Sequence, residues 1–216
     1  MAPLSNGLLI SRSAFASPGT QQFDAPGALS FVVPNFKTSL DIEFWGAGAS
    51  GGPINPAGNN FGDAGGDTYC TALGLKAGGG QRIPNGSNGG EGGVATGGDT
   101  NTTGGRGGAR IANNIGGNGG PGANGGAGGQ GGQGNKQPGR DGQAPGGGGG
   151  GAGSNVNGTA GAQGGAGGAH LKKTYAKGQL KPGDIVSFVV GAGSFTPGLT
   201  IVPGRGANGR AKFTWR

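Results

Sequence analysis

The sequence predicts a mainly β protein: a β-sandwich built from both chain ends, with an inserted glycine-rich bundle of polyglycine II helices. Three observations lead to this fold class. Segments near both ends alternate between apolar and polar residues, as strands with one buried face do. Glycine supplies 61 of the 216 residues and is concentrated in the middle of the chain. There it recurs at every third position, which is the period of an extended threefold helix.

The first region, residues 1–76, has the pattern of β-strands. In the stretch SLDIEFW, Leu40, Ile42 and Phe44 share one face, whereas two acidic residues and a tryptophan share the other. The stretch GDTYCTALGL is a further predicted strand, in which Cys70 is expected to be a small buried side chain. This region therefore supplies half of the predicted sandwich.

The last region, residues 169–216, returns to a strand pattern. The stretches AHLKKTYA and DIVSFVVGAG are joined by LKPGD, a typical turn sequence, and the chain closes on RAKFTWR. Strands at both ends predict that the segment around Ile42 and the segment around Phe213 lie in one sheet system, with the termini close together. The residues expected to form most of the core are Leu40, Ile42, Phe44, Val186, Phe188, Val190 and Phe213.

The middle region, residues 77–168, cannot bury a conventional hydrophobic core. Its large apolar side chains are Ile83, Val94, Ile111, Ile115 and Val156. Ordering a chain costs about 1–2 kcal/mol per residue in backbone entropy, which so few side chains cannot offset. The region is therefore either a disordered spacer or a structure ordered by backbone hydrogen bonds.

The three-residue period favours the ordered alternative. One glycine column runs without a break through Gly116, Gly119, Gly122, Gly125, Gly128, Gly131 and Gly134. Threefold helices have no internal hydrogen bonds, so their peptide groups must bond to neighbouring helices, and only facing sides without Cβ atoms approach closely enough. A disordered spacer does not require glycine at every third position. Collagen requires a longer unbroken run of such triplets, with more proline. We expect a packed bundle in which residues 116–134 either form one long segment or turn back near Pro121.

Composition excludes several classes of protein. One cysteine and one histidine, His170, leave no multi-cysteine zinc site, no paired-histidine metal motif and no catalytic triad. Loop acids such as Asp63, Asp67 and Asp99 are expected to be solvated, and we expect no metal site, no enzymatic activity and no cofactor. Neither a signal peptide nor a membrane span is predicted. The net charge of +7 arises mainly between His170 and Arg216. Solvated strand faces explain this basic segment better than nucleic-acid binding does.

The two flanks resemble the glycine-rich domain of bacteriophage tail-fibre and tail-tip proteins. The similarity rests on Trp45-Gly46-Ala47-Gly48, on Val190-Gly191-Ala192-Gly193 and on Gly209 through Trp215. In that family, a strand ending in Trp-Gly-Ala-Gly precedes a glycine-rich insert, and a closing strand ends in tryptophan. The resemblance gives Trp45, Phe213 and Trp215 structural roles. The insert is also similar to the polyglycine II receptor-binding adhesins of T-even-like phages, except that residues 77–168 contain no aromatic residue.

The resemblance implies a virion structural protein, made in the host cytoplasm, that acts as a tail-fibre, tail-tip or spike adhesin. Its implied partners are other virion proteins and a carbohydrate or outer-membrane protein of the host surface, and assembly as a homotrimer is left open. Membrane insertion and nucleic-acid binding are not expected. Two alternatives are an ice-binding polyglycine II protein and an extracellular glycine-rich structural protein.

Candidate receptor contacts follow from the expected layout. We expect the sandwich, with residues 1–76, to be the particle-attachment side, and residues 1–20 together with the basic C-terminal strands to dock to the particle. Loops at the far end of the bundle then face the host. The stretches ATGGDTNTT and NKQPGRDGQAP carry hydrogen-bonding side chains suited to such contacts. The candidate contact residues are Asp99, Asn101, Thr102, Lys136, Gln137, Arg140 and Asp141. The alternative is that both stretches are merely turns.

Overall fold

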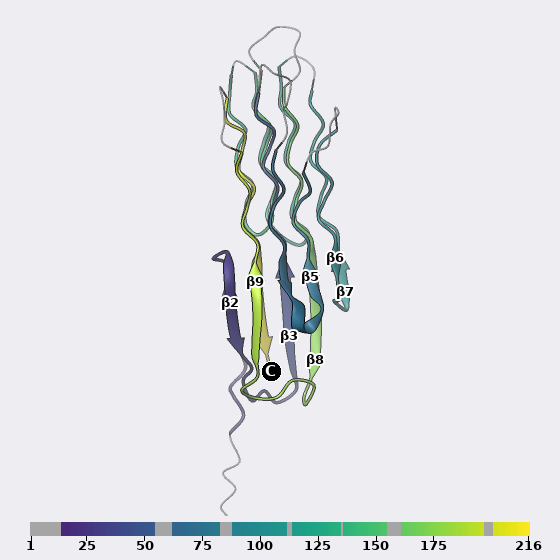
Figure 1. Ribbon diagram of the computed structural model, residues 1–216, viewed down its shortest axis with the longest axis vertical. Coiled ribbons are helices and arrows are strands. Elements are labelled where there is room, and N and C mark those ends of the chain that lie inside the picture. The colour runs from purple at the N-terminus through teal and green to yellow at the C-terminus, as the bar shows by residue number, and fades with distance from the viewer. Residues whose placement is uncertain are drawn as a thin grey trace, which may run out of the picture.

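The molecule is elongated, with strands at one end and glycine-rich segments running along its long axis to the other end (Figure 1). The computed structural model describes residues 14–54, 62–82, 88–111, 114–134, 136–154, 161–196 and 201–216. The C-terminus and the first described residues lie at the strand end.

Two five-stranded antiparallel sheets form the strand end. The first sheet has the order β1 (Gly19–Phe23), β10 (Arg210–Trp215), β3 (Ser39–Trp45), β8 (His170–Ala176) and β7 (Thr100–Thr102). The second sheet has the order β2 (Gly27–Val32), β9 (Ile185–Val190), β4 (Thr68–Cys70), β5 (Leu75–Ala77) and β6 (Ala95–Thr96), with a short 3-10 helix, η1 (Thr71–Leu73), between β4 and β5. The predicted mainly β sandwich is confirmed.

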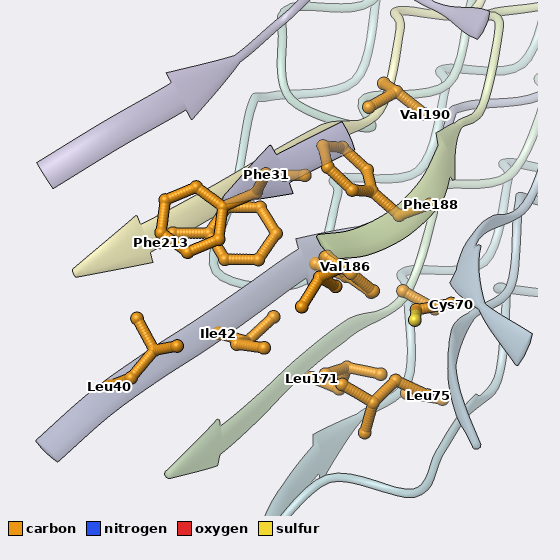
Figure 2. Close-up of a cluster of buried hydrophobic side chains, with 14 of the residues drawn as sticks. Phe31, Leu40, Ile42, Cys70, Leu75, Leu171, Val186, Phe188, Val190 and Phe213 are labelled. Atoms are coloured by element: carbon orange, nitrogen blue, oxygen red, sulfur yellow. The ribbon is translucent and has the colours of Figure 1, made fainter. Parts of the chain in front are cut away.

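The core lies between the two sheets, and all seven residues predicted for it are buried. Phe213 pairs with Ile42 across β10 and β3, as predicted. Its ring stacks on that of Phe31 from the other sheet, with centroids 4.2 Å apart. Figure 2 shows these side chains converging between the strands, with Cys70 at the edge of the cluster. The apolar alternation in the two flanks therefore specifies the packed faces.

Backbone hydrogen bonds hold the glycine-rich segments together. Three successive residues of one segment donate to three different neighbouring segments, and the pattern then repeats. Residues 147, 150 and 153 donate their N–H groups to carbonyls of 143, 140 and 137 in one neighbouring segment. Gly148 and Gly151 donate to residues 120 and 117 of a second neighbour. Gly149 and Ala152 donate to residues 49 and 52 of a third. The assignment of these segments as polyglycine II helices stays a prediction, and this repeating pattern supports it.

The bundle recruits more of the chain than the predicted insert of residues 77–168. The segments that follow β3 and precede β10 also enter it, since Gly48 donates to Ala207 and Gly51 to Gly204. Conversely, the insert itself contributes β6 and β7 to the sandwich. Both differences arise because strands continue directly into glycine segments, so the boundaries at residues 76 and 168 do not separate strands from bundle.

The long glycine run, residues 116–134, is a hairpin. Gly116 donates to Gly132 and Gly119 to Gly129, and the chain reverses where Gly125 donates to the carbonyl of Gly122. Asn124 takes a positive φ of 46° at this turn, a conformation that asparagine tolerates better than most residues. The run therefore turns back slightly beyond the predicted position at Pro121.

The predicted glycine column is a column of close backbone approach, except at its last member. A Cβ atom on any of the six glycines from Gly116 to Gly131 in that column would come within 2.5 Å of a backbone oxygen. Gly134 differs, because its surroundings are open and its φ of +87° is what requires glycine. Glycine is therefore required by close backbone packing at six positions of the column and by a left-handed turn conformation at the seventh.

Candidate functional site

The first predicted contact stretch lies on the sandwich and not at the far end of the bundle. Thr102 pairs with His170, and Asn101 with Leu171, so that β7 forms the edge of the first sheet beside β8. The prediction of a distal loop at Asp99, Asn101 and Thr102 is therefore wrong in its placement. The physical reason is that β7 pairs with β8, which lies about seventy residues farther along the chain. Such a pairing leaves no local signal in the sequence.

Asp99 is held by its neighbours in β8. Its carboxylate accepts hydrogen bonds from the Lys173 ammonium group and from the backbone N–H of Thr174. These bonds lower the pKa of Asp99 below its ordinary value. The Asn101 side chain bonds to both the N–H and the carbonyl of Gly98, and so closes the turn. These groups have the arrangement expected of a stabilised turn.

The second predicted stretch runs down one side of the bundle. Arg140 donates its backbone N–H to Gln130, and Asp141 accepts a hydrogen bond from the backbone N–H of Arg205. Lys136 and Gln137 lie farther from the sandwich, because the carbonyl of Gln137 bonds to Gly153 at the distal end of its segment. The structure thus keeps Lys136 and Gln137 near the far end and places Arg140 and Asp141 along the flank.

A groove at the junction of sandwich and bundle was not predicted from the sequence. It has a volume of about 470 Å³, and its lining includes Gly206 and Ala207. The Arg205 guanidinium, also in the lining, lies 4.3 Å from the centroid of the Phe195 ring. An Asp24–Arg210 ion pair forms part of the lining, as does Asp141. The local sequence signal that could have indicated this groove is Phe195, an aromatic residue shortly after the VGAG motif.

His170 occupies a buried position where the sandwich meets the bundle. Its ring lies 4.6 Å from the Trp45 ring, and its Nδ1 is 3.1 Å from the side-chain nitrogen of Asn124 in the glycine hairpin. The Trp45 indole N–H donates to the carbonyl of Asn124. Trp45 therefore links the glycine hairpin to the sandwich.

The environment of His170 favours its neutral form. Burial lowers the pKa of His170 below its ordinary value of 6.5, and the charges of Lys172 and Lys212 act in the same direction. Glu43 opposes this shift, with its Oε2 lying 3.4 Å from Nε2. His170 therefore couples the junction between sandwich and bundle to pH.

We expect the protein to lose stability as the pH falls below the ordinary histidine pKa. The unfolded chain binds the proton more readily than the folded one, so unfolding gains from acidification in this range. Melting temperatures measured from about pH 7.5 to about pH 5.5, above the range where carboxylates titrate, should fall for the wild type. They should fall less for His170→Gln, and equal slopes for both proteins would refute this role.

Within the described residues, no helix is both long and apolar enough to cross a membrane, and no three His, Cys, Asp or Glu side chains gather where they could hold a metal ion. Comparison of the chain with protein-family models, curated proteins and solved structures found no match.

Proposed function

We propose that this protein is a virion structural protein, a bacteriophage tail-fibre, tail-tip or spike adhesin. The glycine bundle holds loops away from the sandwich, and those loops contact a carbohydrate or outer-membrane protein on the host cell. The sandwich attaches to other virion proteins. The observation that carries this proposal is the polarity of the molecule: the C-terminus lies at the strand end, and the bundle extends from the opposite side (Figure 1).

The strand end suits attachment to a particle. Lys37 and Lys181 are exposed there, and the backbone N–H groups of Lys37 and Thr38 both donate to the carbonyl of Arg216, which holds the C-terminus in place. The predicted docking side also included residues 1–20, of which 1–13 lie outside the described residues. A basic end of this kind favours acidic surfaces on the particle proteins.

The bundle suits a protein that must present loops at a fixed distance. Its segments bond to each other along their length mainly through peptide groups. The exposed column of residues 118, 130 and 133 is polar, and Asn118 also takes part in the scaffold, because its side-chain oxygen accepts a hydrogen bond from the backbone N–H of Gly131. These features favour a display role over an enzymatic one.

Two experiments test the proposed function directly. Mass spectrometry of purified phage particles from the source of this gene should detect the protein as a stoichiometric component. Antibodies raised against the bundle should block adsorption of those particles to host cells, whereas antibodies against an unrelated virion protein should not. Absence of the protein from particles would refute the proposal.

A charge reversal at the far end should weaken attachment to cells. We expect Lys136→Glu to lower binding of the purified protein to host cells about tenfold, equivalent to about 1.4 kcal/mol. Lys181→Glu, the same change at the exposed strand end, is the matched control and should bind like the wild type. Both variants should melt like the parent, and equal binding by both would exclude Lys136 from the contact surface.

A further inference from the structure

The groove at the junction of sandwich and bundle has the size and the mixed lining of a small-molecule site. Its volume of about 470 Å³ lies within the usual range of about 300–1,000 Å³ for such sites. Four of its side chains give this junction groove its chemistry, those of Asp141, Phe195, Arg205 and Asn208. The structure thus places one contact residue predicted from the sequence, Asp141, in the groove.

Backbone hydrogen bonds hold the walls of the junction groove in place. Gly142 donates its N–H to the carbonyl of Arg205, and Gly206 donates to the carbonyl of Ser194. Three segments that are far apart in the sequence are thereby tied to one another. A site held by the fold itself avoids the entropy cost of ordering loops when a ligand binds.

Asp141 and Asn208 each use one side-chain oxygen to hold the backbone and keep a second polar group for a ligand. One carboxylate oxygen of Asp141 accepts from the backbone N–H of Arg205 at 2.7 Å, and the side-chain oxygen of Asn208 accepts from Gly193 at 2.9 Å. The bond from Gly193 fixes the orientation of the amide, so the other end of Asn208 is an N–H donor. Within the described residues, neither the second Asp141 oxygen nor this donor has a hydrogen-bond partner.

Arg205 and Phe195 place a charged donor beside an apolar surface. The guanidinium lies 4.3 Å from the centroid of the phenyl ring, a cation–π contact that keeps it in position. No carboxylate of the described part of the chain forms an ion pair with this guanidinium, so its N–H groups stay available. The Phe195 side chain is itself 38% exposed and offers apolar surface to a ligand.

This set of donors and acceptors selects hydroxyl groups. A hydroxyl both donates and accepts, so it can donate to the Asp141 carboxylate while it accepts from Arg205 or Asn208. A carboxylate or phosphate ligand only accepts and would lie against the negative charge of Asp141. An ammonium ligand only donates and would lie against the positive charge of Arg205.

The charges of the lining balance and so favour a neutral ligand. Asp24 forms an ion pair with Arg210, and the Asp141 carboxylate binds the backbone of Arg205. The lining therefore contains two acidic and two basic residues, although the whole chain carries a net charge of +7. Such a surface has no excess charge that would attract an ion of either sign.

We propose that the junction groove binds a saccharide. Hydroxyls of a pyranose ring bind Asp141, Arg205 and Asn208, and the C–H groups on one face of the ring pack on the exposed part of Phe195. A pyranose carries both kinds of group, as a site with an apolar surface and a few fixed polar groups requires. The groove lies away from the loops that the proposed function assigns to host contact, so this inference does not rest on those loops.

The test is a ligand-observed NMR titration of the purified full-length protein with D-glucose, D-galactose, D-mannose and N-acetyl-D-glucosamine. Each sugar is added up to about 20 mM, and at least one should bind with a Kd of about 1 mM. Asp141→Asn keeps an oxygen for the Arg205 backbone but replaces the second acceptor with a donor. It should weaken binding of that sugar about tenfold, as should Phe195→Ala, with little change in melting temperature.

Two controls make the result specific to the groove. Asp184→Asn is the same change at the strand end, where the exposed Asp184 carboxylate accepts from the backbone N–H of Lys181, and it should bind the sugar like the wild type. Lys136→Glu tests the far-end loops and should also leave sugar binding unchanged, whatever its effect on attachment to cells. The proposal is overturned if none of the sugars binds, if neither groove variant weakens binding, or if inorganic phosphate displaces the sugar.

Discussion

Gly129→Val should unfold the glycine bundle at temperatures where the wild type is intact. Gly129 is buried, its N–H donates to Gly148, and its carbonyl accepts from Gly119. A Cβ atom there would lie 1.9 Å from the carbonyl oxygen of Arg140, so a backbone segment must move to admit it. Overpacking of this kind costs about 3 kcal/mol when the neighbour cannot yield. In a chain of this size, the melting temperature should fall by about 10 °C.

Ala127→Val is the matched control for this substitution. Ala127 lies in the same segment, two residues earlier, but its side chain is exposed and already has a Cβ atom. The same valine should therefore change the melting temperature little, within the range typical of surface substitutions. Circular dichroism melts of both variants measure the difference. If Gly129→Val melts together with Ala127→Val, close packing does not explain the glycine at this position.

Phe213→Ala should remove about 3–5 kcal/mol from the free energy of unfolding. The side chain is fully buried between the two sheets. Its ring contacts those of Phe31 and Phe188, whose centroids lie 4.2 Å and 5.2 Å away. These neighbours come from the opposite sheet and are fixed by strand pairing, so they cannot collapse into the cavity. Denaturant titration followed by tryptophan fluorescence measures the loss.

The neighbouring residue provides a control for Phe213→Ala. Thr214 lies on the opposite face of β10, where its hydroxyl is 3.1 Å from that of Thr20. Thr214→Ala deletes one exposed hydrogen bond and should cost about 1 kcal/mol or less. An equally small effect for Phe213→Ala would contradict the central position of its ring in the core.

The sandwich could be predicted because the alternation of apolar and polar residues that specifies it lies within single strands. Leu40, Ile42 and Phe44 alternate within one strand, and any antiparallel partner with the same period must bury them. The strands β6 and β7 could not be predicted, because segments of two and three residues are too short to show a period. They are strands only because β5 and β8 lie beside them.

The candidate site was less accessible to sequence reasoning for a related reason. Asp99 has the composition of a solvent-facing loop acid, and only the fold reveals that Lys173 and Thr174 engage it. The flank position of Arg140 and Asp141 depends on how many glycine segments lie side by side, which a period cannot specify. The turn at Asn124, in contrast, carried a usable signal, since asparagine favours the left-handed conformation it adopts there.

The hydrogen-bonded bundle has a thermodynamic consequence for the whole molecule. Its interior consists largely of peptide groups, with glycine at most of the positions that approach each other. Hydration of exposed polar surface lowers the heat capacity on unfolding, whereas hydration of apolar surface raises it. The heat-capacity increment per residue should therefore lie below the usual value of about 12–15 cal/mol/K. A smaller increment flattens the curve of stability against temperature, so the free energy of unfolding should change less between cold and warm conditions than in a protein with a conventional core.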